Sequence, residues 1–138
     1  MESTTRNSTV DGFRVVVHDD RDSVAGMRAA VDDLAAEHGL APETAFDLKV
    51  AVTEAVANAL RHPGAPRAAH VTVAAGDGAV EVEVRNQGRF RVGTGPDVER
   101  GGGLPLMVAL ADEVQFSATE DGTCVRIRMR TASDQGPA

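Results

Sequence analysis

Polar and apolar residues alternate one by one along two segments of the chain, residues 80–85 and 125–130. Each segment follows a β-rich neighbour across an Asp-Gly turn, which predicts two β-hairpins, 70–85 and 113–130. Strict alternation is typical of a sheet with one buried face and one solvated face. The polar row is rich in glutamate in the first hairpin and rich in arginine in the second. We therefore expect cross-strand ion pairs between the two rows.

A further β-rich run, residues 13–19, precedes a segment in which apolar residues recur at helical spacing. Asp22 or Ser23 is suited to cap this first helix, because a short polar side chain accepts a hydrogen bond from the opening turn. Gly39 is suited to end the helix, because glycine readily adopts the left-handed conformation found there.

The second long helix is predicted from Pro42 to about His62, and it carries two distinct faces. The apolar face holds Leu48, Val52, Val56 and Leu60. At about 100° per residue, the members of the polar face fall within about 60° of arc: Asp47, Glu54, Asn58 and Arg61.

These elements predict an α+β fold, arranged as a two-layer α/β sandwich. Because only one face of the sheet is apolar, the two long helices and a short helix at roughly 105–111 must cover that same face. The sheet is expected to be mixed and mostly antiparallel. Residues 13–130 are expected to form one domain between flexible tails at 1–12 and 131–138.

Composition narrows the classes of function. The net charge of −7 argues against a broad contact with a nucleic-acid backbone, but it allows a site for one nucleotide. Cys124 is the one cysteine of the chain, which excludes an internal disulfide and a cysteine-based zinc site, and we expect it in the core. No segment resembles a membrane span or a signal peptide, so a soluble, cytoplasmic protein is expected.

Six of the fourteen glycines fall between Gly88 and Gly103, just before the short helix. Glycine lets a backbone approach a ligand closely, and the start of a helix offers N–H groups to an anion. The stretch lacks the Lys-Ser/Thr ending of a Walker A loop and does not follow the dinucleotide-binding pattern. A phosphate site and a plain flexible loop are both compatible with it.

Glu54 and Asn58 lie one helical turn apart and therefore project together. The amide oxygen of Asn58 suits Mg²⁺, which proteins hold through few side chains together with phosphate oxygens and water. The carboxylate of Glu54 suits the ordering of a water or the removal of a proton from a hydroxyl group. A solvated helix face would also account for the pair.

The order and spacing of four motifs resemble a known superfamily. The motifs "AVTEAVANALRH", "VRNQG", "ERGGGLPLM" and "DGTCVRI" follow one another as the nucleotide-binding boxes of the Bergerat-fold ATPases do. That superfamily includes DNA gyrase, MutL and the histidine kinases. The chain is more similar to the short, single-domain anti-sigma-factor serine kinases, over about residues 13–130. The resemblance implies a histidine-kinase-like ATPase domain that binds ATP and Mg²⁺.

The resemblance also implies roles for individual residues. Glu54 would act as general base or water-ordering carboxylate, and Arg100 would be the lid arginine that reaches the terminal phosphate. Asn58 would be the Mg²⁺ ligand. The remaining positions would contact the nucleotide: Asn86, Gly88, Gly101, Gly103, Leu104 and Thr123.

Asn86 departs from the family pattern, which has aspartate at this position. Asparagine keeps an acceptor oxygen but loses the charge, which implies ATP binding weaker by about tenfold or more. The variant Asn86→Asp is then expected to raise nucleotide affinity. Because an amide can also rotate to present a donor, we expect a blunted preference for adenine over guanine.

Three functions are compatible with the resemblance. The first is an anti-sigma factor with serine/threonine kinase activity, a homodimer that sequesters a sigma factor and phosphorylates an anti-anti-sigma (STAS-type) protein without contacting nucleic acid or membrane. The second is a non-catalytic module that captures a partner stoichiometrically, with Asn86 marking an impaired nucleotide pocket. The third, a detached histidine-kinase ATPase domain, lacks support because the sequence shows no phospho-acceptor helix.

Overall fold

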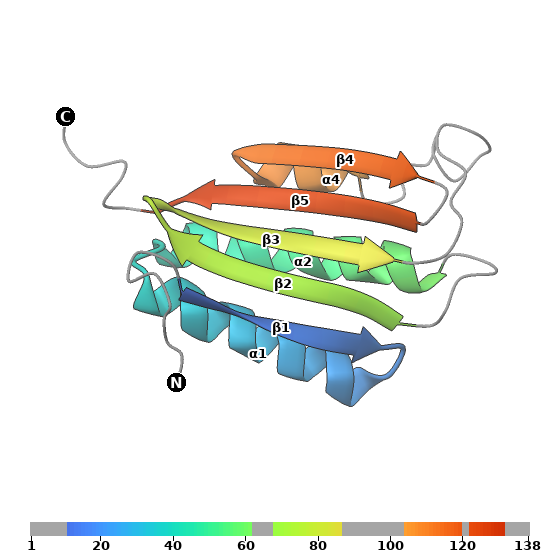
Figure 1. Ribbon diagram of the computed structural model, residues 1–138. Coiled ribbons are helices and arrows are strands. Elements are labelled where there is room, and N and C mark those ends of the chain that lie inside the picture. Colours follow the sequence, from blue (N-terminus) through green and yellow to red (C-terminus); the bar gives the residue numbers. More distant parts are fainter. Residues whose placement is uncertain (1–10, 62–67, 87–103, 120–121, 132–138) are drawn as a thin grey trace, which may run out of the picture.

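The computed structural model describes residues 11–61, 68–86, 104–119 and 122–131 of the chain (Figure 1). The elements follow one another as β1 (Asp11–His18), α1 (Arg21–Glu37), α2 (Pro42–Arg61), β2 (Ala68–Gly76), β3 (Ala79–Asn86), α4 (Leu104–Leu110), β4 (Glu113–Thr119) and β5 (Gly122–Arg130). The strands form a five-stranded sheet in the order β1-β2-β3-β5-β4. All the pairings between the described strands are antiparallel, so the sheet is antiparallel rather than mixed.

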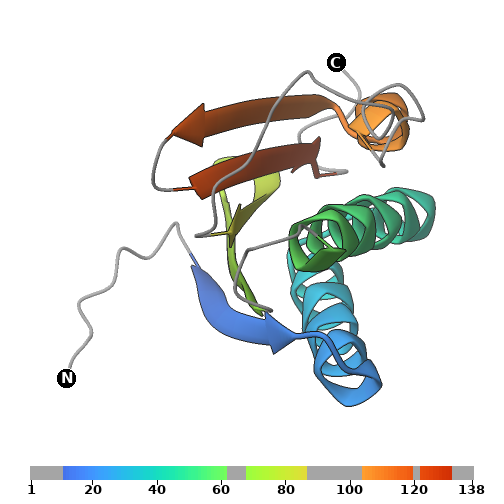
Figure 2. The ribbon, with the colours of Figure 1, turned by 90° about the vertical axis from the view of Figure 1, so that its right-hand side faces the viewer.

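The molecule has two layers, with the sheet on one side and the helices on the other (Figure 2). Helix α2 lies between α1 and α4 and contacts both of them as well as β2, β3 and β5. The expected α+β sandwich, with its helices on a single face of the sheet, is confirmed. The arrangement makes α2 the central element on which the layers meet.

The β2–β3 hairpin turns at the position that its sequence predicts. Asp77 and Gly78 both have positive φ angles, 56° and 79°. Two consecutive positive φ angles are the signature of the type I′ turn, whose twist matches that of the paired strands. The turn sets the register in which Val82 pairs with Val73 and Glu83 with Thr72.

Helix α1 begins earlier than the sequence pattern suggests. Its N-cap is Asp20, whose carboxylate accepts a hydrogen bond of 2.7 Å from the backbone N–H of Ser23. The Ser23 hydroxyl instead accepts from the backbone N–H of His18, at 2.8 Å. The prediction of Asp22 or Ser23 as the cap was therefore wrong. The Ser23 side chain is hydrogen-bonded to the end of β1, and Asp20 caps the helix instead. Gly39 follows the helix with a φ of 82°, as expected of a glycine that ends a helix.

The core lies between the helices and the inner face of the sheet. The predicted apolar face of α2 is confirmed, with all of its members 6% exposed or less: Leu48, Val52, Val56 and Leu60. Three alanines on the same helix are buried beside them, namely Ala51, Ala55 and Ala59. Small side chains at these positions let the backbone of α2 lie close to the strands.

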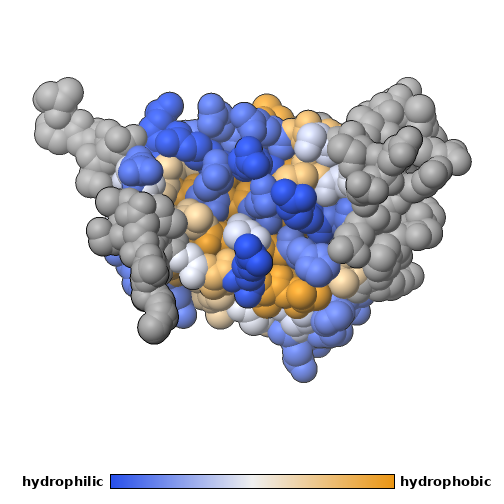
Figure 3. Space-filling view, in the orientation of Figure 1, coloured by the Kyte–Doolittle hydropathy of each residue, from blue (hydrophilic) through white to orange (hydrophobic). Residues whose placement is uncertain are grey.

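The outer face of the sheet carries interspersed polar and apolar residues (Figure 3). The expected cross-strand pairing is confirmed at Glu83, whose carboxylate lies 2.8 Å from the guanidinium of Arg126. The hydrogen bond from Arg126, with help from Arg85, lowers the pKa of the Glu83 carboxyl group. The ion pair thus links β3 to β5 on the solvated side.

Cys124 lies on this outer face and not in the core, so its predicted burial was wrong. Strand alternation puts Cys124 in the row of Arg126, while Val125 and Ile127 point inward. The thiol is partly covered, and this burial together with the nearby Glu83 carboxylate raises its pKa. The cysteine is therefore held as a neutral thiol at neutral pH.

Thr131 follows β5, is 4% exposed and donates its backbone N–H to the Gly78 carbonyl at 2.9 Å. None of the helices within the described ranges is both long enough and apolar enough to cross a membrane.

Candidate functional site

Glu54 and Asn58 lie on the flank of α2 that faces α4. The opposite flank faces α1, since Thr53 and Ala57 line a hollow with Val24 of α1. At about 100° per residue, Glu54 and Asn58 point well away from that flank. Both side chains are half-buried. Glu54, the predicted base, and Asn58, the predicted metal ligand, are therefore both partly buried on the same side of α2.

Asn86 of β3 contacts the last turn of α2, the helix that carries Glu54 and Asn58. It is the last residue of β3 and lies in the inward-facing row, where it is 3% exposed. Its side-chain nitrogen Nδ2 donates a hydrogen bond of 2.8 Å to the backbone carbonyl of Ala59. Ala59 directly follows Asn58, so the predicted base-binding residue is bonded to the backbone of the residue next to the predicted metal ligand.

The contact with Ala59 also fixes the orientation of the Asn86 amide. Only the nitrogen of an amide can donate to a carbonyl, so a rotation by half a turn would set two oxygens against each other. Such a rotation in a buried setting would lose the hydrogen bond and add repulsion. The freely rotating amide that the sequence suggested is therefore not what the structure contains.

Two further predicted contact residues lie in the described elements. Thr123 of β5 is paired in register with Asn86 of β3, and it lies in the same inward-facing row. Leu104 is the first residue of α4, the helix that packs against α2. The predicted contacts Gly88, Gly101 and Gly103 and the predicted catalytic Arg100 lie outside the described residues, as does His62.

The described residues have the chemistry that a magnesium–nucleotide complex needs. Asn58 offers a neutral amide oxygen, which is a hard ligand, and Glu54 offers a carboxylate one turn away. Mg²⁺ typically takes few ligands from the protein and completes its shell with phosphate oxygens and water. In the sequence, the glycine-rich stretch lies between Asn86, the last residue of β3, and Leu104, the first residue of α4. The donor set therefore fits the group.

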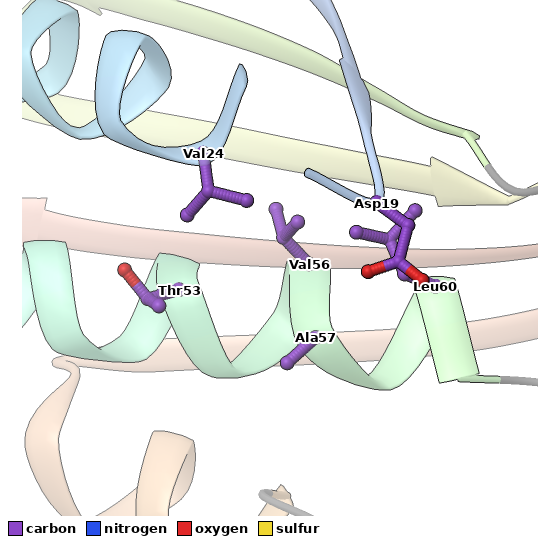
Figure 4. Close-up of a pocket in the computed structure, with 6 residues that line it drawn as sticks. All are labelled: Asp19, Val24, Thr53, Val56, Ala57 and Leu60. Carbon is purple, nitrogen blue, oxygen red and sulfur yellow. The ribbon is translucent and has the colours of Figure 1, made fainter. Parts of the chain in front are cut away.

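A hollow lies on the flank of α2 that is turned toward α1 (Figure 4). It has a volume of about 180 Å³ and is lined by Asp19, Val24, Thr53, Val56, Ala57 and Leu60. Pockets for drug-sized ligands occupy roughly 300–1,000 Å³. The Thr53 hydroxyl already donates to the Lys49 carbonyl at 2.7 Å. This hollow is too small for a nucleotide and is separate from Glu54 and Asn58.

The Ala59 carbonyl, which accepts the hydrogen bond from Asn86, was not predicted from the sequence. A backbone carbonyl carries no sequence signature of its own, but one signal was present. The helical partner of this carbonyl would be the N–H of residue 63, which is a proline and has none. Another donor was therefore needed at this point of the fold.

The chain matches the model of the histidine kinase-like ATPase domain family over residues 10–129. The match covers most of the chain, so the chain belongs to this family. No curated protein matches the chain.

Two solved structures share the fold. One contains the RsbU and RsbW domains of Rv1364c from Mycobacterium tuberculosis, with a TM-score of 0.69 and 24% sequence identity over 87% of this chain. The other is the histidine kinase domain of a blue-light activated histidine kinase from Erythrobacter litoralis, with a TM-score of 0.55 and 19% identity over 83% of this chain. The present chain spans 32% and 62% of those two chains, respectively.

Proposed function

We propose that the chain is an ATP-binding anti-sigma factor with serine/threonine protein kinase activity. The observation that carries the proposal is that Glu54 and Asn58 lie one turn apart on α2 while Asn86 is hydrogen-bonded to Ala59 of the same helix. Membership of the histidine kinase-like ATPase family supports ATP as the nucleotide and Mg²⁺ as its metal. The four sequence motifs and the likeness to a fold that contains an RsbW domain support the anti-sigma branch.

In the proposed reaction, the oxygen of a substrate serine forms a bond to the γ-phosphorus of ATP, and the bond from that phosphorus to the β-phosphate oxygen breaks. Glu54 accepts the hydroxyl proton or orders the hydroxyl group. Asn58 would hold the metal, which would supply positive charge to the phosphates when bound. Arg100 and the backbone N–H groups of Gly101 and Gly103 stabilise the charge on the transferred group.

The proposed partners are proteins. A sigma factor would be sequestered by a homodimer of the chain, and an anti-anti-sigma protein of STAS type would be the phosphorylated substrate. Such a protein regulates transcription, as in a stress response, without touching DNA itself, in agreement with the net charge of −7. A sigma factor acts on RNA polymerase, so the proposed location is the cytoplasm.

The test is transfer of labelled phosphate from ATP to a candidate anti-anti-sigma protein in the presence of Mg²⁺. We expect Glu54→Ala to abolish transfer while ATP binding persists. Glu43→Ala, which removes an exposed carboxylate from the first turn of the same helix, is the matched control and should leave transfer unchanged. If the wild type captures a sigma factor but transfers no phosphate, the kinase proposal fails and the stoichiometric binding module replaces it.

A further inference from the structure

At the C-terminal turn of α2, the sequence leaves a backbone carbonyl without its usual helical hydrogen-bond donor. The last four carbonyls of a helix have no N–H partner within the helix. Ala59 belongs to this group, and the residue four positions on is Pro63, which has no N–H in any conformation. Ala59 is only 9% exposed, so water reaches it poorly. A buried carbonyl without a donor is costly, and a side chain from another element can supply the donor.

Asn86 supplies that donor across the interface between the two layers. Its Nδ2 lies 2.8 Å from the Ala59 carbonyl oxygen, and the Asn86 side chain is itself buried. An aspartate has the same size and shape, but in its ionised form it has no hydrogen to donate. Asparagine at this position is therefore suited to a helix that ends in proline, and its presence does not by itself indicate a decayed pocket.

The Asn86–Ala59 hydrogen bond connects the two elements that carry the proposed nucleotide contacts, β3 and α2. On one side, Ala59 adjoins Asn58 in the chain. On the other, Asn86 ends β3 and leads into the glycine-rich segment. A movement of the last turn of α2 would displace the Asn58 amide, and the bond from Asn86 opposes that movement.

We propose that Asn86 is a positioning residue, which holds the last turn of α2 so that Asn58 meets the metal of a bound magnesium–nucleotide complex. This inference rests on the proposed nucleotide-binding function and adds a second role to a residue expected only to contact the base. It also reverses one expectation from the sequence. Replacing Asn86 by the family's aspartate weakens binding rather than strengthening it.

The reason lies in the atoms that would face each other. In Asn86→Asp, a carboxylate oxygen replaces the donor nitrogen about 2.8 Å from the Ala59 carbonyl oxygen. The site is buried and lies at the C-terminal, negative end of the α2 dipole. Both effects raise the pKa of the new carboxyl group in the folded state. Its protonated form can donate to Ala59, whereas its ionised form is repelled.

The experiment compares the wild type with Asn86→Asp, and with Gln115→Glu as the matched control. Gln115 is exposed on β4, and its side-chain oxygen accepts a hydrogen bond of 3.2 Å from Arg126, so a carboxylate is tolerated there. Affinity for ATP is measured by calorimetry with and without Mg²⁺. We expect Asn86→Asp to weaken binding of magnesium–ATP by roughly tenfold and to reduce the gain in affinity that Mg²⁺ provides. Gln115→Glu should change neither quantity.

The second readout is the urea midpoint between pH 4 and pH 8, without nucleotide. A carboxyl group with a raised folded-state pKa is best tolerated while protonated, below its unfolded pKa of about 4. The stability deficit of Asn86→Asp should therefore be small near pH 4 and grow as the pH rises through the raised pKa. The packed elements carry these titratable groups: Glu43, Asp47, Lys49, Glu54 and Arg61 on α2, Glu81, Glu83 and Arg85 on β3, and Cys124, Arg126, Arg128 and Arg130 on β5. Wild type and variant share them all, so they cancel in the difference.

Three outcomes separate the possibilities. The inference is overturned if Asn86→Asp binds magnesium–ATP as well as the wild type, or keeps the full gain from Mg²⁺. If the wild type binds no nucleotide, the proposed function fails instead, and the positioning role fails with it. If Asn86→Asp does not fold at neutral pH, Asn86→Ala takes its place, since it removes the donor without adding charge and should lose the same Mg²⁺-dependent affinity.

Discussion

Helix α4 depends on a single deeply buried side chain among those described, and this dependence gives a sharp prediction. Met107 is 1% exposed, whereas its neighbour Val108 is 60% exposed. Met107→Ala removes the thioether end from the space between α4 and the rest of the core. Val108→Ala truncates a side chain of similar character that points into solvent, so it is the matched control on the same helix.

The magnitude follows from the burial. Truncating a buried methionine to alanine costs about 2–5 kcal/mol, from lost apolar burial and from the cavity left behind. For a domain of this size, 1 kcal/mol corresponds to roughly 3 °C in Tm, so a loss of about 3 kcal/mol lowers Tm by about 10 °C. Val108→Ala should stay within about 0.5 kcal/mol. Met107→Leu conserves volume and should recover most of the stability.

The loss should also be felt in the site, since α4 faces the flank of α2 that carries Glu54 and Asn58. Urea unfolding gives the free-energy change, and ATP affinity is measured at a temperature at which all variants remain folded. We expect Met107→Ala to bind ATP several-fold more weakly than Val108→Ala does. Equal stability losses for the two alanine variants would refute the assignment of Met107 as the anchor. An unchanged ATP affinity in a clearly destabilised Met107→Ala would refute the link from α4 to the site.

Three further predictions follow from other parts of the molecule. Gly12→Ala should destabilise the protein by roughly 2 kcal/mol, because a new Cβ would lie 2.1 Å from the Val73 carbonyl oxygen, whereas Gly26→Ala in α1, with nothing within 4 Å, should gain about 0.5–1 kcal/mol in urea unfolding. The Glu83–Arg126 pair contributes about 0.5 kcal/mol above the unfolded pKa of Glu83, since the Arg126 side chain is 43% exposed; this stability is lost as the pH falls through the lowered folded pKa, and Glu83→Gln should remove that part of the pH dependence. The Asn86 amide is held in one orientation, so the wild type should prefer ATP over GTP by about tenfold or more in competition binding. This is the order of discrimination that one fixed hydrogen-bonding pattern provides. Equal affinities for the two nucleotides would show that the amide rotates.

Much of the fold could be predicted because the relevant signals are local. Alternation over 80–85 and 125–130 gave both the strands and the buried face, and the apolar stripe of α2 ends within one residue of its predicted limit. The same alternation already assigned Cys124 to the arginine row, and only a general preference of cysteine for burial argued otherwise. Here a periodic pattern was a better guide than the average behaviour of a residue type.

The parts that could not be predicted depend on contacts between distant segments. Asp20 caps α1 because the end of β1 engages Ser23, and a cap search within the helix sequence alone does not see that contact. The Asn86–Ala59 bond joins residues 27 positions apart. The roles of Gly88, Arg100, Gly101 and Gly103 remain predictions, since they rest on the motif resemblance and lie outside the described residues.

The position of β5 has a consequence for how the protein is made. This strand, the last one in the described residues, lies between β3 and β4, so β3 lacks its second neighbour and β4 lacks its pairing partner until residues 122–130 exist. A ribosome releases a chain from its amino end, so β5 leaves the exit tunnel after β1, β2, β3 and β4. The sheet is therefore completed only after residues 122–130 have emerged, and a product terminated before them lacks the strand that joins β3 to β4. Thr123, paired with Asn86, belongs to that strand, so the candidate site is also incomplete until then.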